Sequence, residues 1–363
     1  MRRMLALCVA LAAMTACASP PASAPAGSSA LPAASSAPSA PAASRAASAP
    51  AATAPPRERV TILYPNQGGN QTATWLAKDA GLYDKYGLDA DVEFIEGSPT
   101  VMQAVTAGNA QIAIVGTTAS ISAAFRGLDA VLIATAQPGL LYTLWSSTIP
   151  QVSDLRGKRI ATGRINTDPD FALRLLLDRL GLVYNQDVTV VHVDAGGETA
   201  RIAAAQGGSA DAVMLTTGNS GMMRRLGFAP LVDMVSEHIP YEAATVVTTR
   251  SFAASKPEAV RGFMRAFVEA IALAKRDRAA VLDLYRKYAR LEDAEIAGEW
   301  YDEYVQRVFP RAPYVSEAGV QTVLNLLAQT EPQAVEVKPE QYIDNQYVRE
   351  LDDAGFIRQL YPD

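Results

Sequence analysis

The sequence predicts an α/β protein with two lobes. Short β-rich runs alternate with amphipathic helices from Val60 onward, and this rhythm occurs twice, first up to about residue 145 and again from about residue 152. Strands that alternate with helices favour parallel sheets with helices packed against them. Two such lobes joined by crossing strands form a cleft at the C-terminal ends of their strands, where ligands usually bind.

The first lobe begins with four β-rich runs separated by turn residues. The helix after the second run is the best marked, with Ser98 at the N-cap, Pro99 in the first helical position and Gly108 just past the end. In the helix after the first run, Leu76 and Tyr83 share an apolar face. The predicted strands of this lobe are 60–64, 90–95, 110–116 and 130–137.

The second lobe repeats this pattern. Asp168 at the N-cap and Pro169 after it start the helix that follows its first strand, and Gly181 ends that helix. Its predicted strands are 158–162, 187–193, 210–216 and 229–235, with a second helix over 198–206. The run 244–252 is expected to return to the first lobe as a strand, and amphipathic helices around 260–271 and 296–308 follow it.

The N-terminal sequence predicts an export signal. Two arginines precede an apolar stretch of about a dozen residues, which is too short for a permanent membrane span. The stretch ends in "MTAC", which resembles a bacterial lipobox with Met14 where leucine is usual. We therefore expect cleavage before Cys17, with lipid on its thiol and on the new amino terminus. The alternative is an ordinary signal cut at a neighbouring small residue, which would leave Cys17 without a lipid.

Residues 18–56 consist almost wholly of Ala, Ser and Pro. Such a segment has too little apolar bulk to fold, so we expect a disordered tether between an anchor and the folded region. No later stretch is apolar for long enough to span a bilayer. The expected organisation is a lipoprotein signal peptide at 1–16, the tether at 17–57, a first lobe at 58–145 plus 246–363, and a second lobe at 146–245.

Composition narrows the function. The chain has 363 residues and a formal net charge of −6, so nucleic acid, whose phosphates attract basic surfaces, is not an expected partner. Cys8 and Cys17 are the only two cysteines, and two histidines are too few for a His-rich metal centre. The motifs GxSxG, GxxxxGK[ST] and HExxH are missing, as is a GxGxxG after a strand. We therefore expect a binding protein rather than an enzyme, with no catalytic residues, cofactor or metal.

Polar loops follow most of the predicted strands, at the end where a cleft would lie. They read NQGGNQT, GSPT, GTTAS and QPGLLY in the first lobe and GRINTDPD, DAGGET and TTGNS in the second. Several precede helices, whose first N–H groups lack partners within the helix and can bind anions or polar groups. Each loop alone is also consistent with ordinary turn and capping chemistry. Their shared position favours a binding site.

One long stretch carries a family resemblance. The sequence "WLAKDAGLYDKYGLDADVEFIEGSPTVMQAVTAGNAQIAIVG" resembles the first lobe of periplasmic substrate-binding proteins of ABC importers, in the branch that binds nitrate, taurine, alkanesulfonates and thiamine pyrimidines. "DLRGKRIAT", "SFAASKPEAVRGFMRAFVEAI" and "YIDNQYVREL" match later parts, so the resemblance covers roughly residues 60–360. It implies the two-lobed type II fold of periplasmic binding proteins, which closes on a small molecule and delivers it to a membrane permease. We expect a lipid-anchored monomer in the periplasm or on the outer face of the cytoplasmic membrane.

The resemblance also implies a set of ligand-binding residues in the cleft. Tyr142 and Tyr241 are candidates for stacking on a ring, Glu242 for reaching the cleft beside the return strand, and Arg164 is the only expected cation. The full set is Asn66, Gln67, Ser98, Thr117, Thr118, Tyr142, Arg164, Thr167, Asp168, Thr216, Thr217, Asn219, Tyr241 and Glu242.

The ligand itself stays open between two classes. A nitrate or sulfonate anion would use helix N-termini and Arg164, whereas an aromatic or vitamin-like ligand would use a tyrosine platform with amides at its edges. The amide-rich loops and scarce cations favour a neutral or weakly charged organic molecule. A sensor that binds its ligand without transport is a further alternative. An enzyme like the eukaryotic relative that makes the thiamine pyrimidine is disfavoured, because that relative uses a Cys-rich motif and this chain has no cysteine after Cys17.

Overall fold

The computed structural model describes residues 57–165, 167–193, 195 and 197–361. The predicted signal peptide, Cys17 and nearly all of the predicted tether lie outside the described residues. Among the helices that are described, none combines the length and the hydrophobicity needed to cross a bilayer.

The described chain forms two five-stranded sheets with the same topology. In the first sheet the strand order is β2-β1-β3-β10-β4, and in the second it is β7-β6-β8-β5-β9. The strands of the first sheet are β1 (Glu58–Tyr64), β2 (Leu88–Phe94), β3 (Ile112–Gly116), β4 (Ala130–Pro138) and β10 (Glu242–Thr249). Those of the second are β5 (Tyr142–Ser146), β6 (Arg159–Thr162), β7 (Thr189–His192), β8 (Ala212–Thr216) and β9 (Ala229–Asp233).

Both sheets are mixed rather than parallel, so the prediction of parallel sheets is wrong for one strand in each. β1 runs parallel to β2 and β3, but β10 is antiparallel to β3 and β4. Likewise, β6 runs parallel to β7 and β8, but β5 is antiparallel to β8 and β9. β5 and β10 are the strands that arrive from the other sheet. Each enters at the carboxyl edge, where its first residues pair with the last residues of its neighbours, so it must run against them.

Each of the two crossing strands, β5 and β10, lies wholly in one sheet. β5, which the sequence left unassigned, pairs only with strands of the second sheet, and β10 pairs only with strands of the first. The expected lobe limits after residues 145 and 245 therefore fall inside β5 and β10. From here on, the first lobe means the first sheet with its helices, and the second lobe means the second sheet with helices α5–α7.

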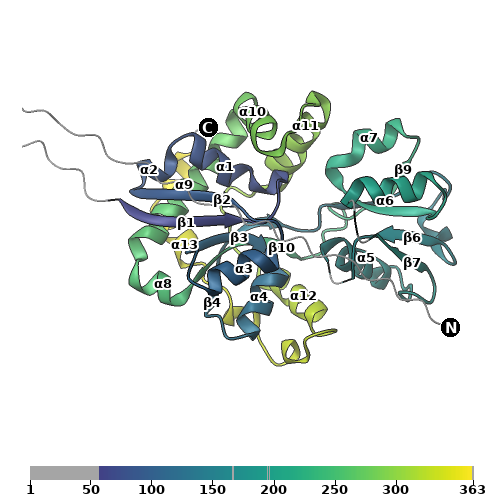
Figure 1. Ribbon diagram of the computed structural model, residues 1–363, viewed down its shortest axis with the longest axis horizontal. Coiled ribbons are helices and arrows are strands. Elements are labelled where there is room, and N and C mark those ends of the chain that lie inside the picture. The colour runs from purple at the N-terminus through teal and green to yellow at the C-terminus, as the bar shows by residue number, and fades with distance from the viewer. Residues whose placement is uncertain (1–56, 166, 194, 196, 362–363) are drawn as a thin grey trace, which may run out of the picture. The chain divides into compact units, whose positions relative to one another are not determined.

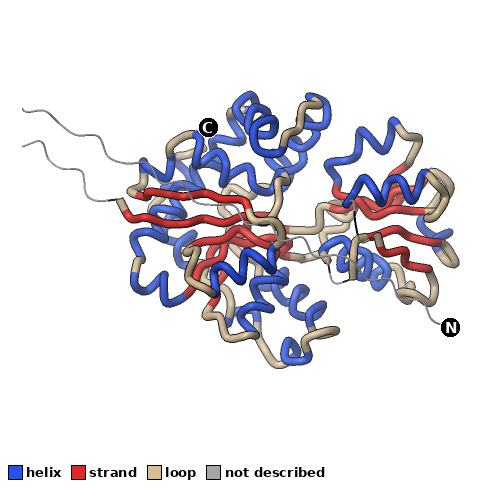
Figure 2. Tube along the Cα trace, viewed as in Figure 1, coloured by secondary structure: helices blue, strands red, loops and turns tan. Residues whose placement is uncertain are grey.

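Helices cover both faces of each sheet (Figures 1 and 2). The helices of the first lobe are α1 (Thr72–Asp79), α2 (Leu82–Lys85), α3 (Ser98–Thr106), α4 (Thr117–Phe125), α8 (Arg250–Ser255), α9 (Pro257–Arg276), α10 (Arg278–Ala289), α11 (Ala294–Trp300), α12 (Glu317–Leu327), α13 (Gln346–Asp353) and α14 (Phe356–Gln359). Those of the second are α5 (Asp168–Arg179), α6 (Gly197–Gln206) and α7 (Ser220–Arg225). Short 3₁₀ turns are η1 (Gly69–Gln71), η2 (Val152–Leu155), η3 (Thr217–Asn219), η5 (Pro332–Val335) and η6 (Pro339–Gln341).

The strand alternation of side chains builds the cores. In the first sheet, Ile62 and Ile114 point to the face covered by α1 and α9, whereas Leu63 and Val115 point to the face covered by α3, α4 and α12. In the second sheet, Met214 packs on the side of α5, and the next residue, Leu215, packs on the side of α6 and α7. Burial of each such side chain contributes about 1.5–3 kcal/mol. The two sheets are thereby held as firm supports for the loops at their strand ends.

Two predicted elements end differently from expectation. The run 244–252 was expected as one strand, but helix α8 begins at Arg250 because the Thr249 hydroxyl accepts a hydrogen bond from the N–H of Phe252 at 3.1 Å. The helix predicted over 296–308 is α11 followed by the π-helix η4 (Tyr301–Val308). π-Helical turns are rare and occur frequently at functional sites.

Candidate functional site

A cavity of about 340 Å³ lies at the carboxyl ends of both sheets. Its volume is within the range of small-molecule binding sites. The first sheet and its loops contribute Asn66, Gln67, Gly68, Asn70, Ser98, Gly116, Gln137, Ala243 and Ala244, the second lobe contributes Tyr142, Asp168, Glu198 and Thr216, and the C-terminal helices contribute Trp300 and Tyr304. We call this cavity the strand-end cavity.

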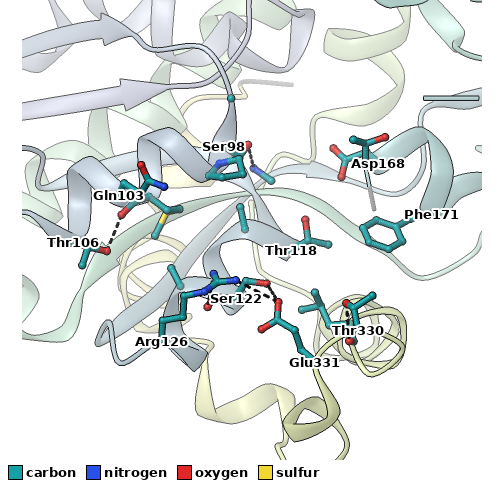
Figure 3. Close-up of a pocket in the computed structure, with 18 of the residues that line it drawn as sticks. Ser98, Gln103, Thr106, Thr118, Ser122, Arg126, Asp168, Phe171, Thr330 and Glu331 are labelled. Atoms are coloured by element: carbon teal, nitrogen blue, oxygen red, sulfur yellow. Dashed lines mark hydrogen bonds and ion pairs between the residues drawn. The ribbon is translucent and has the colours of Figure 1, made fainter. Parts of the chain in front are cut away.

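A larger cavity of about 830 Å³ adjoins it and shares Ser98, Gly116 and Asp168 with it. We call this one the helix-side cavity, because most of its lining comes from α3, α4 and the residues around the end of α12, facing the start of α5. Figure 3 shows Asp168 and Phe171 on one side of it and Ser98 and Thr118 on the other. We place the candidate site at the strand-end cavity, because strand ends and helix starts of both sheets converge there.

Helix starts clamp strand ends in the same way in both lobes. In the first lobe, the Ser98 hydroxyl at the start of α3 accepts the N–H of Gly116, the last residue of β3, at 3.1 Å. In the second, Oε1 of Glu198 at the start of α6 accepts the N–H of Thr216, the last residue of β8, at 2.7 Å. Both pairs are separated by 18 positions. A glycine with positive φ precedes each clamp, at 91° for Gly97 and 56° for Gly197.

Glu198 gathers several donors of the second lobe around one carboxylate. Besides the N–H of Thr216, it accepts the Thr216 hydroxyl at 3.0 Å and the Asn219 amide at 2.5 Å, both on Oε2. Oε1 also accepts the guanidinium of Arg201 at 3.1 Å. The predicted residues Thr216 and Asn219 are thus brought together, around an acidic residue that the sequence reasoning missed. The signal for it was its position, 18 residues before the end of the strand, as for Ser98.

Asp168 lies where the two cavities meet. A Cβ atom on Gly116 would lie 3.9 Å from its Oδ2 and 3.4 Å from the Ser98 hydroxyl, so this carboxylate of the second lobe reaches the end of β3. Among the described residues, no lysine, arginine or histidine lies within ion-pair distance of it. Burial raises the pKa of Asp168 to about 6. The pKa values of Tyr142 and Tyr241 are raised by their own burial and, secondarily, by the nearby Asp168 carboxylate.

Three aromatic side chains line the strand-end cavity, and we call them together the aromatic wall. Tyr142 begins β5, Trp300 ends α11 and Tyr304 lies one turn on, in the π-helix η4. Trp300 and Tyr304 meet edge to face with ring centroids 6.0 Å apart. The amphipathic pattern expected over 296–308 includes Trp300 and Tyr304 in its apolar face, and aromatic residues four positions apart give the same pattern whether they face a core or a cavity.

Two glycines make room for this wall. A Cβ on Gly69 would come within 2.2 Å of Cδ2 of Tyr304, and one on Gly218 within 2.6 Å of Nε1 of Trp300. Gly69 belongs to the first lobe and Gly218 to the second. The Trp300–Tyr304 pair therefore packs tightly against backbone of both lobes.

The other predicted site residues divide into three groups. Asn66 and Gln67 are exposed and line the strand-end cavity, where Oδ1 of Asn66 also accepts the N–H of Gly68 at 2.9 Å. Thr118, Arg164 and Thr167 line the helix-side cavity instead. The described lining of either cavity does not include Thr117, Thr217, Asn219, Tyr241 or Glu242.

Glu242 and Thr117 occupy structural positions rather than the cleft wall. Glu242, expected to reach the cleft, is buried and accepts the Thr135 hydroxyl at 2.7 Å and the N–H of Ser316 at 2.9 Å. Its burial raises its pKa to about 8. The hydroxyl of Thr117 is buried against that of Thr245 at 3.3 Å. Tyr241 and Thr217 are likewise buried.

The strand-end cavity has an acidic lining. Its described lining includes the carboxylates of Asp168 and Glu198 but no lysine, arginine or histidine. Arg126 and Arg164 line only the helix-side cavity, where both are exposed. The part of the chain that the structure describes holds no group of three or more His, Cys, Asp or Glu placed to bind a metal ion.

Comparisons with known proteins agree with this architecture. The family model described as "NMT1/THI5 like" matches residues 69–279, more than half of the chain. A protein of Brucella abortus (strain 2308), whose name describes it as a binding protein of unstated ligand, is 24% identical over 242 residues, covering 62% of this chain and 70% of its own.

Solved structures share the fold. The periplasmic aliphatic sulphonate binding protein SsuA of Escherichia coli matches with a TM-score of 0.68 and 20% identity, covering 80% of this chain and 99% of its own. The alkanesulfonate-binding protein SsuA of Xanthomonas axonopodis pv. citri, bound to MOPS, matches with a TM-score of 0.59 and 19% identity, again over 80% and 99%. At these identities the likeness shows the fold, which is that of periplasmic binding proteins.

Proposed function

The chain belongs to the NMT1/THI5-like family, and on that footing we propose that it is an extracytoplasmic solute-binding protein of an ABC importer. In this proposal it captures a small organic molecule in the strand-end cavity and delivers it to the permease without chemical change. The observation that carries the proposal is the convergence of polar side chains from both sheets, including Asn66, Ser98, Asp168 and Thr216, on one cavity of ligand size.

Ligand binding would act through closure of the two lobes. A molecule that touches strand ends of both sheets binds the closed arrangement better than an open one, so it shifts the population toward the closed form. Contacts of the C-terminal helices with the second lobe favour the same state. Oε2 of Glu299 accepts the N–H of Gly221 at 2.9 Å, and Arg307 pairs with Asp233 at 3.0 Å.

A sulfonate or another anion is the second candidate for the ligand. Both solved structures described above are named as sulfonate-binding proteins, and Arg126 and Arg164 line the helix-side cavity. An anion held there would leave the strand-end cavity unused.

Native mass spectrometry of the protein purified from its own host tests the proposal. We expect a small molecule bound at one copy per chain, and loss of its uptake when the gene is deleted. Uptake that continues normally after deletion, together with a lost cellular response to the molecule, would instead make the protein a sensor.

The proposed localisation depends on Cys17. We propose that cleavage before Cys17 and its lipidation hold the protein at the membrane through the tether at 17–57. The variant Cys17→Ser should move the protein from the membrane fraction to the soluble fraction with an unchanged melting temperature, because Cys17 lies far outside the two lobes as the structure describes them, from β1 onward. Equal membrane retention of Cys17→Ser and the wild type would remove the lipid anchor from the proposal.

A further inference from the structure

We propose that the ligand is a small organic cation whose charged nitrogen lies against the carboxylate of Asp168 and whose body lies against the aromatic wall of Tyr142, Trp300 and Tyr304. This inference rests on the proposed function, because it assigns the chemistry of the same strand-end cavity. It differs from the sulfonates named for the solved neighbours.

The backbone donors at the ends of β3 and β8 are already used by the protein. Glu198 takes the N–H of Thr216, the Thr216 hydroxyl, the Asn219 amide and the guanidinium of Arg201, at distances of 2.5–3.1 Å. In the first lobe, the N–H at the end of β3 is taken by Ser98. A carboxylate belonging to the chain thus lies at the end of β8, bound to the backbone N–H and the hydroxyl of Thr216. An anion at the end of β8 would therefore face the carboxylate of Glu198 rather than a free backbone N–H.

The charges around the cavity do not balance. Arg201 is only 6% exposed and pairs with Glu198, so these two charges offset each other. Asp168 has no described cationic partner and lies at the junction of both cavities. Asp168 is half-buried. A partly buried carboxylate without a cationic partner is unfavourable, and a ligand with a positive charge would relieve this cost. The net negative charge of the side chains around the strand-end cavity therefore favours a cationic ligand.

The aromatic wall fits the same ligand class. Tyr142, Trp300 and Tyr304 all line the cavity that contains the two carboxylates. Ring faces of tryptophan and tyrosine attract organic cations, most strongly where water is excluded, as at the buried Tyr142 and Tyr304. Asn66 and Gln67 add amide groups that can accept hydrogen bonds from further N–H groups of the ligand.

Ionisation of Asp168 gives the inference a distinctive pH dependence. The charged and titratable groups around it are Glu198 in the strand-end cavity with its partner Arg201, Arg164 in the helix-side cavity, and the phenols of Tyr142 and Tyr241. Burial raises the pKa of both phenols well above their ordinary value, so they stay neutral. Because the pKa of Asp168 is about 6, cation affinity should be full at pH 8 and should fall as the pH drops through 6. An anion would show the opposite trend.

The experiment measures binding of matched probes by isothermal titration calorimetry to the mature protein. Benzamidine, tryptamine and choline are the cations; benzamide, tryptophol and 3,3-dimethylbutanol are their neutral counterparts; benzenesulfonate, ethanesulfonate and butanesulfonate are the anions. We expect at least one cation to bind, its neutral counterpart to bind at least tenfold more weakly, and the affinity to fall about tenfold between pH 7.5 and pH 5 as Asp168 is protonated.

Two variants locate the effect. Asp168→Asn should weaken cation binding at least tenfold at pH 7.5 and abolish its pH dependence. Asp178→Asn is the matched control, because Asp178 lies on the same helix, is exposed and lines neither cavity. If Asp168→Asn does not fold, the pH titration of the wild-type protein decides alone.

The outcomes separate the inference from the proposed function. Binding of a sulfonate that tightens as the pH falls, or a neutral or anionic molecule co-purified with the protein, overturns the cation while leaving a solute-binding protein. If no probe binds, the charge of the co-purified molecule decides, and a cation supports the inference. No binding by any probe together with no co-purified molecule overturns both.

Discussion

The same corner is built twice in this protein, once at the end of β3 and once at the end of β8. In both, the first turn of a helix supplies an oxygen to the N–H of the last strand residue, from 18 positions earlier in the chain. The contacts just before the opposite, amino ends of β3 and β8 also correspond. Oε1 of Gln111 accepts the N–H of Thr61 at 2.8 Å, and Oδ2 of Asp211 accepts the N–H of Arg159 at 2.8 Å.

The two corners differ in what they leave for a ligand. The first combines a hydroxyl, Ser98, with a glycine, Gly116, and so is small and uncharged. The second combines a carboxylate, Glu198, with a threonine, and ties them to Asn219 and Arg201. The scaffold therefore needs only an acceptor at the helix start. The side chain that supplies this acceptor determines the charge of the cavity lining and the space left for a ligand.

The largest expected effect comes from breaking the two clamps separately. Glu198→Ala removes the acceptor of four donors and leaves the buried Arg201 unpaired, so it should lower the free energy of unfolding by about 2–4 kcal/mol. Ser98→Ala removes one hydrogen bond and should cost about 1 kcal/mol. Urea denaturation of both variants measures the difference.

Equal losses in the free energy of unfolding for Glu198→Ala and Ser98→Ala would contradict this prediction, since the second clamp would then be no stronger than the first. Thr199→Ala is a control on the same turn of α6, because this exposed residue lines neither cavity. It should change stability by less than about 0.5 kcal/mol.

The sequence predicts the framework of these corners better than their chemistry. The rule that cleft residues follow strands places Asn66, Ser98, Asp168 and Thr216 at the strand-end cavity, where the structure has them. It does not reveal Glu198, because an acidic residue in a helix's first turn also has an ordinary capping role. It also misses Trp300, because an aromatic residue on an amphipathic helix gives no sign of whether it faces the core or a cavity.

The antiparallel direction of the crossing strands could not be predicted from the sequence, for a related reason. β5 and β10 are β-rich runs like any other, and their antiparallel direction follows from the edge at which the chain enters each sheet. That edge depends on the path between the sheets, which local patterns of hydrophobicity do not encode. The α/β class, in contrast, depends only on the alternation of elements, and it is confirmed.

An intermediate effect is expected at Asp168, which the second lobe places against the first corner. The unfolded pKa of an aspartate is about 3.9, whereas burial raises the folded pKa of Asp168 to about 6. Between these values the folded state binds more protons than the unfolded state, so stability falls as the pH rises from about 4 to about 6 and stays lower above it.

Asp168→Asn should remove this cost. We expect the ligand-free variant to be about 1–2 kcal/mol more stable than the wild type at pH 7.5, after allowance for partial solvent exposure, and about equal to it at pH 4. Thermal unfolding at both pH values measures this difference. A variant that is less stable than the wild type at pH 7.5 would mean that the carboxylate supports the fold, in contrast to Glu198.

The smallest effect on stability is expected for Gly116→Ala, which tests how much space the first corner leaves for a ligand. Gly116 has a φ of −56°, which any residue can adopt, and a Cβ there would lie 3.4 Å from the Ser98 hydroxyl and 3.9 Å from Oδ2 of Asp168. These are ordinary van der Waals distances, so Gly116→Ala should change the free energy of unfolding by less than about 0.5 kcal/mol. The added methyl group nevertheless occupies space between the two polar groups that face the ligand. Binding of the co-purified molecule should therefore weaken several-fold, as measured by calorimetry, whereas unchanged affinity would mean that the ligand stays on the side of the second corner.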